Sequence, residues 1–180
     1  MAHASRSSRE RRPPPPLDAA ALERLALRYV ERFATTEGRL ADYLRRKLRE
    51  RGAAEGDAPD ATAVAARMVT LGYVDDRGYA EARAAALSRH GYGERRVAAT
   101  LRAAHVGEAA AAPALEHSRD AAVESALALA RRRRIGPFAP ATPDDKLRER
   151  QLAIMLRAGH GFALSRAIVN TGPGETFESD

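Results

Sequence analysis

The sequence predicts an all-α protein whose helices form small units stacked into an elongated, curved body. The 180-residue chain is rich in the helix formers Ala, Arg, Leu and Glu, and only 5% of its residues are aromatic. Its apolar residues recur every three or four positions, which places them on one face of a helix. No segment shows the strict alternation of a strand. A weak internal repeat indicates that the helices are grouped in sets of three.

The N-terminal third of the chain predicts a disordered arm followed by three helices. Met1–Pro16 combines Ser and Arg with a run of prolines and offers no hydrophobic face, so we expect residues 1–19 to be a disordered basic arm. Thr36 and Asp60 are the expected N-caps of the second and third helices, and Gly52 ends the second. The three apolar faces are Leu22, Leu25, Ala26, Tyr29 and Phe33; Leu40, Tyr43, Leu44 and Leu48; and Val64, Met68 and Leu71.

A joint at positions 72–80 connects the third helix directly to a fourth. Gly72 suits the left-handed residue that ends a helix, Asp75 is placed as the next N-cap, and Asp76 as an acid in the first turn. Because both aspartates fit the capping pattern, we prefer this interpretation to a metal-binding or acid–base pair. The positions of a hydrophobic staple are occupied by Val74 and Tyr79. The tyrosines expected in the core are Tyr29, Tyr43, Tyr73 and Tyr79.

A second set of helices is expected after the joint. Its first helix covers about residues 76–90, and its second carries Val97 and Leu101. An Ala-rich third segment reaches His117, and Pro113 should start or break it because proline does not fit a helix interior. Tyr92, in the turn between the first two helices, is the one aromatic residue predicted as an exposed contact.

A third set of helices completes the predicted fold. Its first helix covers residues 120–134. The segment Thr142–Asp145 is a start signal, with a cap, a proline and first-turn acids, for a second helix that continues to Gly159. A short final helix covers residues 162–169. Residues 170–180 contain glycines, a proline and acids, and we expect a flexible acidic tail.

A short motif recurs at a period near fifty residues. Leu44–Gly52, Leu101–Gly107 and Leu156–Phe162 share a Leu-Arg start and a glycine at or next to the end, each late in the second helix of its set. This predicts three tandem three-helix repeats, each too small to bury a core alone, stacked into a long curved body that suits a long partner. The predicted boundaries of the repeats are residues 20–74, 75–117 and 118–169.

Two basic segments flank an acidic-to-neutral middle. Residues 17–52 carry nine basic and six acidic residues, residues 118–162 carry nine and five, and residues 53–92 have a net charge of −2. This pattern fits a partner that presents both phosphates and protein surface. The chain has no cysteine, which suits a reducing compartment. With no apolar run of membrane length and no signal-peptide core, we expect a cytoplasmic protein with no membrane partner.

Ten basic residues are the candidate contacts with DNA or with an acidic protein surface. They are Arg45, Arg46, Lys47 and Arg49; the run Arg131, Arg132, Arg133 and Arg134; and Arg148 and Arg150. The alternative for each group is a solvated helix face or helix end. The five histidines lack ligand spacing, and the chain has no Gly-rich phosphate loop and no recognisable catalytic triad. We therefore expect no metal, no cofactor, no small-molecule substrate and no enzymatic activity.

The joint resembles the signature of the RecX family, bacterial regulators of the RecA recombinase, and the structural signature residues are Gly72, Tyr73, Asp75, Asp76 and Tyr79. The resemblance covers roughly Leu22 to Val169. It is supported by Arg28-Tyr29, by Leu44–Gly52, and by Gly93 before Arg95-Arg96-Val97. His105 stands where the second repeat of the family usually has glycine. RecX proteins are similarly built of three tandem three-helix repeats.

The resemblance implies a protein that binds in the groove of RecA filaments on single-stranded DNA. Such regulators block filament extension or promote disassembly, lowering ATP hydrolysis, strand exchange and co-protease activity. They thereby modulate homologous recombination, DNA repair and the SOS response. The alternative is a direct DNA-binding helical protein, a transcription or architectural factor. Against it, the second helices lack the Asn, Gln and Ser that typically contact base edges.

Overall fold

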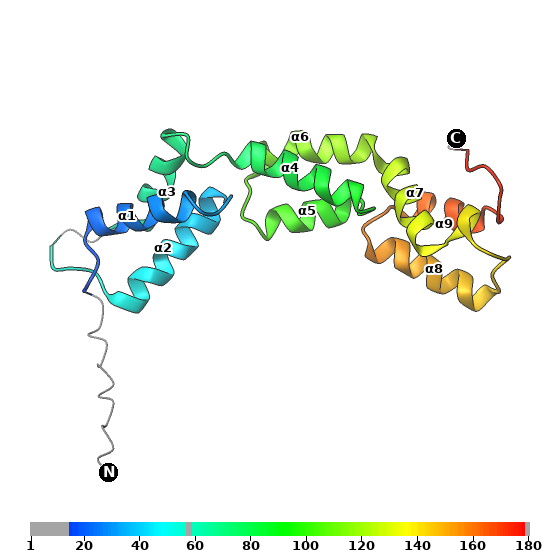
Figure 1. The fold of residues 1–180 in the computed structure, drawn as a ribbon, viewed down its shortest axis with the longest axis horizontal. Helices are drawn as coiled ribbons and strands as arrows, with labels where there is room; N and C mark the ends of the chain where they lie inside the picture. Colours follow the sequence, from blue (N-terminus) through cyan, green and yellow to red (C-terminus); the bar gives the residue numbers. More distant parts are fainter. Residues whose placement is uncertain (1–14, 57–58, 179–180) are drawn as a thin grey trace, which may run out of the picture.

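The computed structural model describes residues 15–56 and 59–178. Within these ranges the chain forms nine α-helices and one short 3₁₀ helix, which confirms the all-α fold class. The helices follow one another along an elongated, curved arch, with α1 near one end and α9 near the other (Figure 1). Their bounds are α1 Ala19–Val30, α2 Glu37–Arg51, α3 Ala61–Thr70, α4 Asp76–Arg89, α5 Glu94–Arg102, α6 Glu108–Asp120, α7 Ala122–Arg133, η1 Gly136–Phe138, α8 Asp145–Arg157 and α9 Phe162–Asn170.

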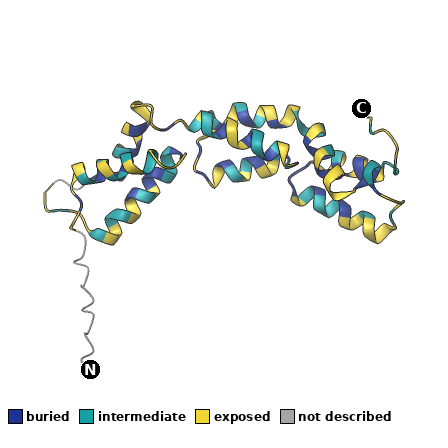
Figure 2. Ribbon diagram, in the orientation of Figure 1, coloured by how far each residue is buried: buried dark blue, intermediate teal, exposed yellow. Residues whose placement is uncertain are grey.

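The described helices pack around three hydrophobic cores that follow one another along the arch, with buried residues in each (Figure 2). We call α1–α3 the first unit, α4–α6 the second and α7–α9 the third. Aliphatic side chains such as Leu40, Leu44 and Met68 fill the first core. The second core is largely alanine, and its larger buried side chains are Leu87, Val97, Leu101 and Val106. That the three units are repeats of one motif stays a prediction.

Side-chain caps begin several helices where the sequence predicts them. Thr36, Asp60 and Asp75 each accept a backbone N–H two or three residues later, at 2.8 to 3.3 Å. The start of α8 differs from the prediction, because Asp144 caps it, two residues after the expected cap Thr142. These helix starts are therefore encoded locally, by short side chains beside free N–H groups, whereas α5, α6, α7 and α9 begin without a side-chain cap.

Replacing Asp75 with alanine should lower the free energy of unfolding by about 1 kcal/mol, because the first turn of α4 loses its cap. Asp75→Asn is the matched control, since asparagine caps helices about as well as aspartate. Urea unfolding followed by circular dichroism measures both variants. If both variants lost the same stability, the charge of Asp75 and not its capping bond would be responsible.

The predicted arm is too long at its C-terminal end. Leu17 is fully buried in the first core, and its backbone pairs with the loop after α2. Its N–H donates to Gly52 at 2.9 Å, and its carbonyl accepts the N–H of Ala54 at 2.9 Å. The guanidinium of Arg51 also donates to the carbonyl of Pro15. The chain is thus anchored from residue 15 onward, and the expected disorder of residues 1–14 lies outside the described residues.

Pro113 neither starts nor breaks the third helix of the second unit, so that prediction is wrong. The helix α6 begins at Glu108, after Gly107, and continues through Pro113 to Asp120. Ala111 and Ala114, on either side of the proline, are buried in the second core. Packing of this apolar face offsets the loss of the backbone hydrogen bond that proline cannot make.

The C-terminal tail contacts the third unit, instead of extending freely as predicted. After α9 the chain turns, and the N–H of Gly174 donates to the carbonyl of Pro137 at 2.9 Å. The ring of Phe177 packs against the third core. Residues 171–178 therefore belong to the third unit, and the last two residues lie outside the described part of the chain.

Replacing Phe177 with alanine should lower the stability of the protein by about 1 kcal/mol, because a half-buried aromatic ring loses its contact with the third core. The neighbouring exposed residue supplies the control, and Glu178→Ala should leave the unfolding midpoint unchanged. Thermal melting of both variants measures the difference. Identical melting of Phe177→Ala and the unaltered protein would mean that the tail does not hold the third unit.

Two predictions about the joint between α3 and α4 need correction. Tyr73 is 55% exposed, so it is not a core residue. The predicted hydrophobic staple of Val74 and Tyr79 is also wrong, because Val74 is buried in the first core and Tyr79 packs against the second. The joint therefore links two cores and leaves one aromatic side chain on the surface. Gly72, with a φ of +77°, has the predicted left-handed conformation.

Candidate functional site

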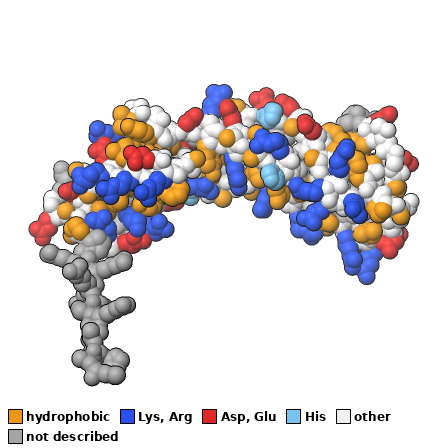
Figure 3. Space-filling model, in the orientation of Figure 1, with side chains coloured by type: hydrophobic (Ala, Val, Ile, Leu, Met, Phe, Trp, Pro, Cys, Tyr) orange, Lys and Arg blue, Asp and Glu red, His pale blue; other side chains and the backbone are white. Residues whose placement is uncertain are grey.

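The second helix of each unit, α2, α5 and α8, lies along the inner, concave side of the arch (Figure 1). All three helices are positively charged. The basic and acidic residues number six and three in α2, three and one in α5, and four and two in α8. Lys and Arg side chains are visible along this edge in the space-filling view (Figure 3). By contrast, α6 on the outer side has one basic and three acidic residues. The inner side therefore attracts a polyanion.

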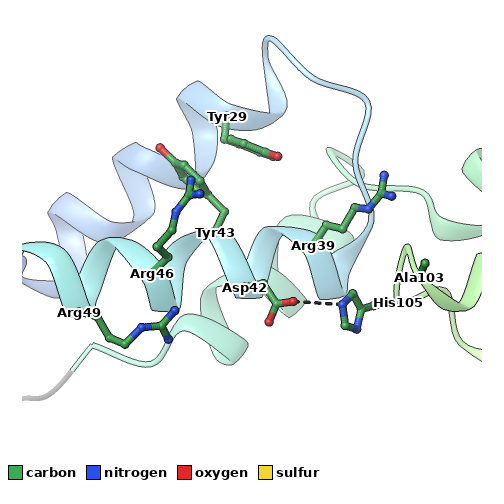
Figure 4. Close-up of a pocket in the computed structure, with 8 residues that line it drawn as sticks. All are labelled: Tyr29, Arg39, Asp42, Tyr43, Arg46, Arg49, Ala103 and His105. Carbon is green, nitrogen blue, oxygen red and sulfur yellow. Dashed lines mark ion pairs between the residues drawn. The ribbon is translucent and has the colours of Figure 1, made fainter.

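A groove opens between the first and second units. It has a volume of about 560 Å³, close to that of small-ligand sites. Two helices of the first unit and the segment after α5 contribute its walls (Figure 4). The lining residues are Tyr29, Arg39, Asp42, Tyr43, Arg46, Arg49, Ala103 and His105. Two of the predicted contact residues, Arg46 and Arg49, are among them. We call this feature the junction groove.

Three guanidinium groups give the junction groove its positive charge. Arg39 donates to the hydroxyl of Tyr79 at 2.7 Å, a neutral partner that leaves its charge uncompensated. Arg49 is exposed and forms no ion pair with any residue in the described ranges. Arg46 lies 3.7 Å from Glu50, but both side chains are about half exposed, and such pairs contribute little. The groove can therefore hold an anion.

The one carboxylate of the groove is already engaged from two sides. Asp42 accepts from Arg45 at 2.7 Å, and its other oxygen lies 3.1 Å from Nε2 of His105 (Figure 4). His105 has a φ of +57°, a conformation that favours glycine. Its side chain packs directly over Gly38, where no larger residue fits. His105 thus adds a polar contact between the first and second units.

An aromatic stack continues along one wall of the junction groove. The rings of Tyr29 and Tyr43 are stacked with their centres 4.3 Å apart, whereas the ring of Phe33, which does not line the groove, is tilted by 46° and lies 5.1 Å from that of Tyr29. The guanidinium of Arg46 lies 5.6 Å from the centre of the Tyr43 ring. Tyr29 and Tyr43 are half-buried, and Phe33, beside Tyr29, is 56% exposed. Helical spacing correctly placed Tyr29 and Tyr43 against the core, but it gave no sign that they also line a groove.

Polar contacts hold the first unit to the second. The hydroxyl of Thr36 donates to the carbonyl of Ala104 while it caps α2. The N–H of Glu37 donates to the carboxylate of Asp76 at 2.8 Å. Asp76, predicted only as a first-turn acid of α4, therefore also accepts an N–H group from the first turn of α2 in the neighbouring unit. The sequence has no local signal for either contact, because the partners lie 39 and 68 residues apart.

Backbone contacts hold the second unit to the third. The N–H of Gly93 donates to the carbonyl of Ala158 at 2.9 Å, and Nε2–H of His160 donates to the carbonyl of Gly91 at 3.0 Å. Burial lowers the pKa of His160 and thereby favours the neutral ring. Tyr92 packs against both the second and the third core, so it is not the exposed contact that its position in a turn predicts.

The remaining predicted contacts in the first unit are tied to near neighbours. Besides Asp42, Arg45 contacts the hydroxyl of Thr62 at 3.0 Å. Lys47 donates to Glu50 at 2.6 Å, and this hydrogen bond lowers the pKa of the Glu50 carboxyl. Neither Arg45 nor Lys47 lines the junction groove.

The predicted contacts in the third unit form separate surface groups. The guanidinium of Arg131 lies 4.7 Å from the centre of the Phe138 ring, and Arg134 ends α7 in the left-handed conformation. Arg148 bonds to Asp145 at 2.7 Å within the first turn of α8. The exposed members with no ion pair in the described part of the chain are Arg131, Arg132, Arg133, Arg134 and Arg150. These residues lie on and after α7 and on α8, in the third unit, whereas the junction groove lies between the first and second units (Figure 1).

The described residues contain no helix long and apolar enough to cross a membrane. Nor do they contain a cluster of three or more His, Asp or Glu side chains that could hold a metal ion. Within that part of the chain, the candidate site is the charged inner surface together with the junction groove.

Similarity to known proteins identifies the family. No protein-family model matches the chain. The chain is 31% identical over 161 residues to the regulatory protein RecX of Myxococcus xanthus, covering 84% of this chain and 86% of that protein. The chain belongs to the RecX family. The regulatory protein RecX of Thermus thermophilus is 35% identical over 143 residues, covering 79% of this chain and 87% of that protein. The relatives are regulatory proteins, and a regulatory role follows for this chain.

Solved RecX structures share the fold. The crystal structure of RecX from Lactobacillus salivarius superposes with a TM-score of 0.59 at 16% identity, covering 84% of this chain and 94% of that one. A second crystal structure of a regulatory protein RecX gives a TM-score of 0.58 at 21% identity, covering 83% of this chain and 72% of that one. The predicted resemblance to RecX is therefore confirmed in both sequence and fold.

Proposed function

We propose that this RecX-family protein binds RecA filaments on single-stranded DNA and restrains their extension, ATP hydrolysis, strand exchange and co-protease activity. Through this action it would modulate recombination, DNA repair and the SOS response. The observation that carries the proposal is the row of three positively charged helices, α2, α5 and α8, along the inner side of the arch. A long, concave, positive surface suits a long, negatively charged partner better than a small ligand.

The mechanism follows from the shape of the molecule. An arch that contacts adjacent subunits of a filament stabilises one relative arrangement of those subunits at the expense of others. Such bridging would slow the conformational step that couples ATP hydrolysis to filament growth. Within the inner side, Arg95, Arg96 and Arg102 on α5 connect the predicted contact residues of α2 with those of α8. The run Arg131–Arg134 remains a candidate contact with the acidic side of a filament subunit or with DNA.

Filament assembly tests the proposal. RecA is added to single-stranded DNA carrying a fluorescent base analogue, whose signal follows coating by RecA, with this protein added before or after assembly. We expect slower assembly in the first order and partial loss of signal in the second. No change in either order, together with tight sequence-specific binding to duplex DNA, would contradict the proposal and favour the helical DNA-binding alternative.

A further inference from the structure

We propose that the junction groove is a binding site for single-stranded nucleic acid. In this site a base joins the aromatic stack, and adjacent phosphates bind the guanidinium groups of Arg39, Arg46 and Arg49. The inference rests on the proposed function and deepens it, because it assigns the DNA contact of the regulator to one groove in the first unit.

The charges of the groove favour a phosphate. Three guanidinium groups line it, and the carboxylate of Asp42 is already engaged by Arg45 and His105. An anion that enters the groove therefore meets positive charge without breaking an ion pair of Arg39 or Arg49, because Arg39 bonds only to the neutral hydroxyl of Tyr79 and Arg49 has no ion pair with a described residue. Guanidinium groups bind phosphate oxygens in pairs, which suits successive phosphates of one strand.

The aromatic stack distinguishes a nucleic acid from an acidic peptide. The rings of Tyr29 and Tyr43 are stacked with their centres 4.3 Å apart, and the guanidinium of Arg46 lies 5.6 Å from the centre of the Tyr43 ring. A peptide carboxylate would use the arginines and leave this stack without a role. A base uses both, since its flat face stacks on an aromatic ring or on a guanidinium plane.

The same stack favours a single strand over a duplex. Bases of a duplex are stacked on one another and present only their edges, whereas a single strand offers free faces. Stacking is tolerant of sequence, so we expect no strong preference among bases. The groove also lies on α2, one of the three helices of the inner side, so a strand bound here continues onto that side.

Direct binding in the absence of RecA tests the site. The full-length protein is titrated into a fluorescein-labelled oligothymidylate, and anisotropy is measured across a range of salt concentrations. Arg46→Gln with Arg49→Gln should weaken binding tenfold or more and reduce the salt dependence by about 1.4 log units per log unit of salt, since each single-strand phosphate contact contributes about 0.7. The matched control is Arg24→Gln with Arg28→Gln, two exposed arginines of α1 that do not line the groove.

Equal weakening by both double variants, or by neither, would overturn the proposal. A second measurement leaves the protein unaltered: an oligonucleotide containing 5-bromodeoxyuridine is photocrosslinked and the attachment sites are mapped by mass spectrometry. We expect crosslinks at Tyr29 or Tyr43; crosslinks only elsewhere would overturn the proposal. These assays contain no RecA. A protein that binds DNA in the groove but leaves RecA unaffected would therefore contradict the proposed function and keep the site.

Discussion

Replacing Gly93 with alanine is expected to destabilise the protein by about 2 kcal/mol and to loosen the joint between the second and third units. A Cβ atom at this position would lie 2.6 Å from the carbonyl oxygen of Gly159 and 2.8 Å from the backbone nitrogen of His160. Both are backbone atoms and cannot rotate away. The φ of Gly93 is −83°, so any loss comes from the close approach of two units and not from backbone strain.

Gly107 supplies a closely matched control for this prediction. Like Gly93 it is an N-cap with extended backbone and no side-chain cap, but an added Cβ would meet nothing within 4 Å. Gly107→Ala should therefore cost much less than Gly93→Ala in urea unfolding. Small-angle X-ray scattering then measures the dimensions of the arch, and we expect a changed radius of gyration only for Gly93→Ala. Equal losses of stability with unchanged scattering would show that the close approach does not hold the units together.

Reversing two charges in the middle of the inner side should raise the concentration of this protein needed to half-inhibit RecA by about tenfold. The change is Arg95→Glu with Arg102→Glu, two exposed residues of α5. Each reversal places a negative charge against a negatively charged partner, and a loss of about 1.4 kcal/mol corresponds to a factor of ten. Circular dichroism should show unchanged helicity.

The control for this charge reversal lies in the same unit. Arg83→Glu with Arg89→Glu makes the same change in net charge on α4, which does not belong to the inner side (Figure 1). We expect near-normal inhibition of RecA by this variant. Similar loss in the two double variants would mean that net charge matters and the inner side does not.

Local features of the fold could be predicted from the sequence, because their causes are local. The caps Thr36, Asp60 and Asp75 bond to N–H groups two or three residues away, and the left-handed Gly72 ends α3 as expected. Features that depend on distant partners could not be predicted from the sequence. Leu17 is buried because it meets the loop after α2, and Phe177 packs because it meets the third core. Both residues lie in segments of low local helical preference, so the local sequence gives no sign of this packing.

The candidate site was predicted only in part for the same reason. The cluster of basic residues in the sequence predicted Arg46 and Arg49 as contact residues. The contribution of Arg39, Tyr29 and His105 appears only when α1, α2 and the segment after α5 meet at the junction groove. Tyrosines at helical spacing predict core packing, and a half-buried tyrosine that also lines a groove gives the same pattern.

Steady-state ATP hydrolysis by RecA on single-stranded DNA, titrated with this protein, is the most direct test of the proposed regulatory role. The proposal predicts inhibition at amounts below one molecule per RecA subunit, because an arch that bridges subunits affects more than the subunits it contacts. Inhibition that requires saturation of free DNA would point to simple competition for the strand. Unchanged hydrolysis at excess protein would contradict the central claim.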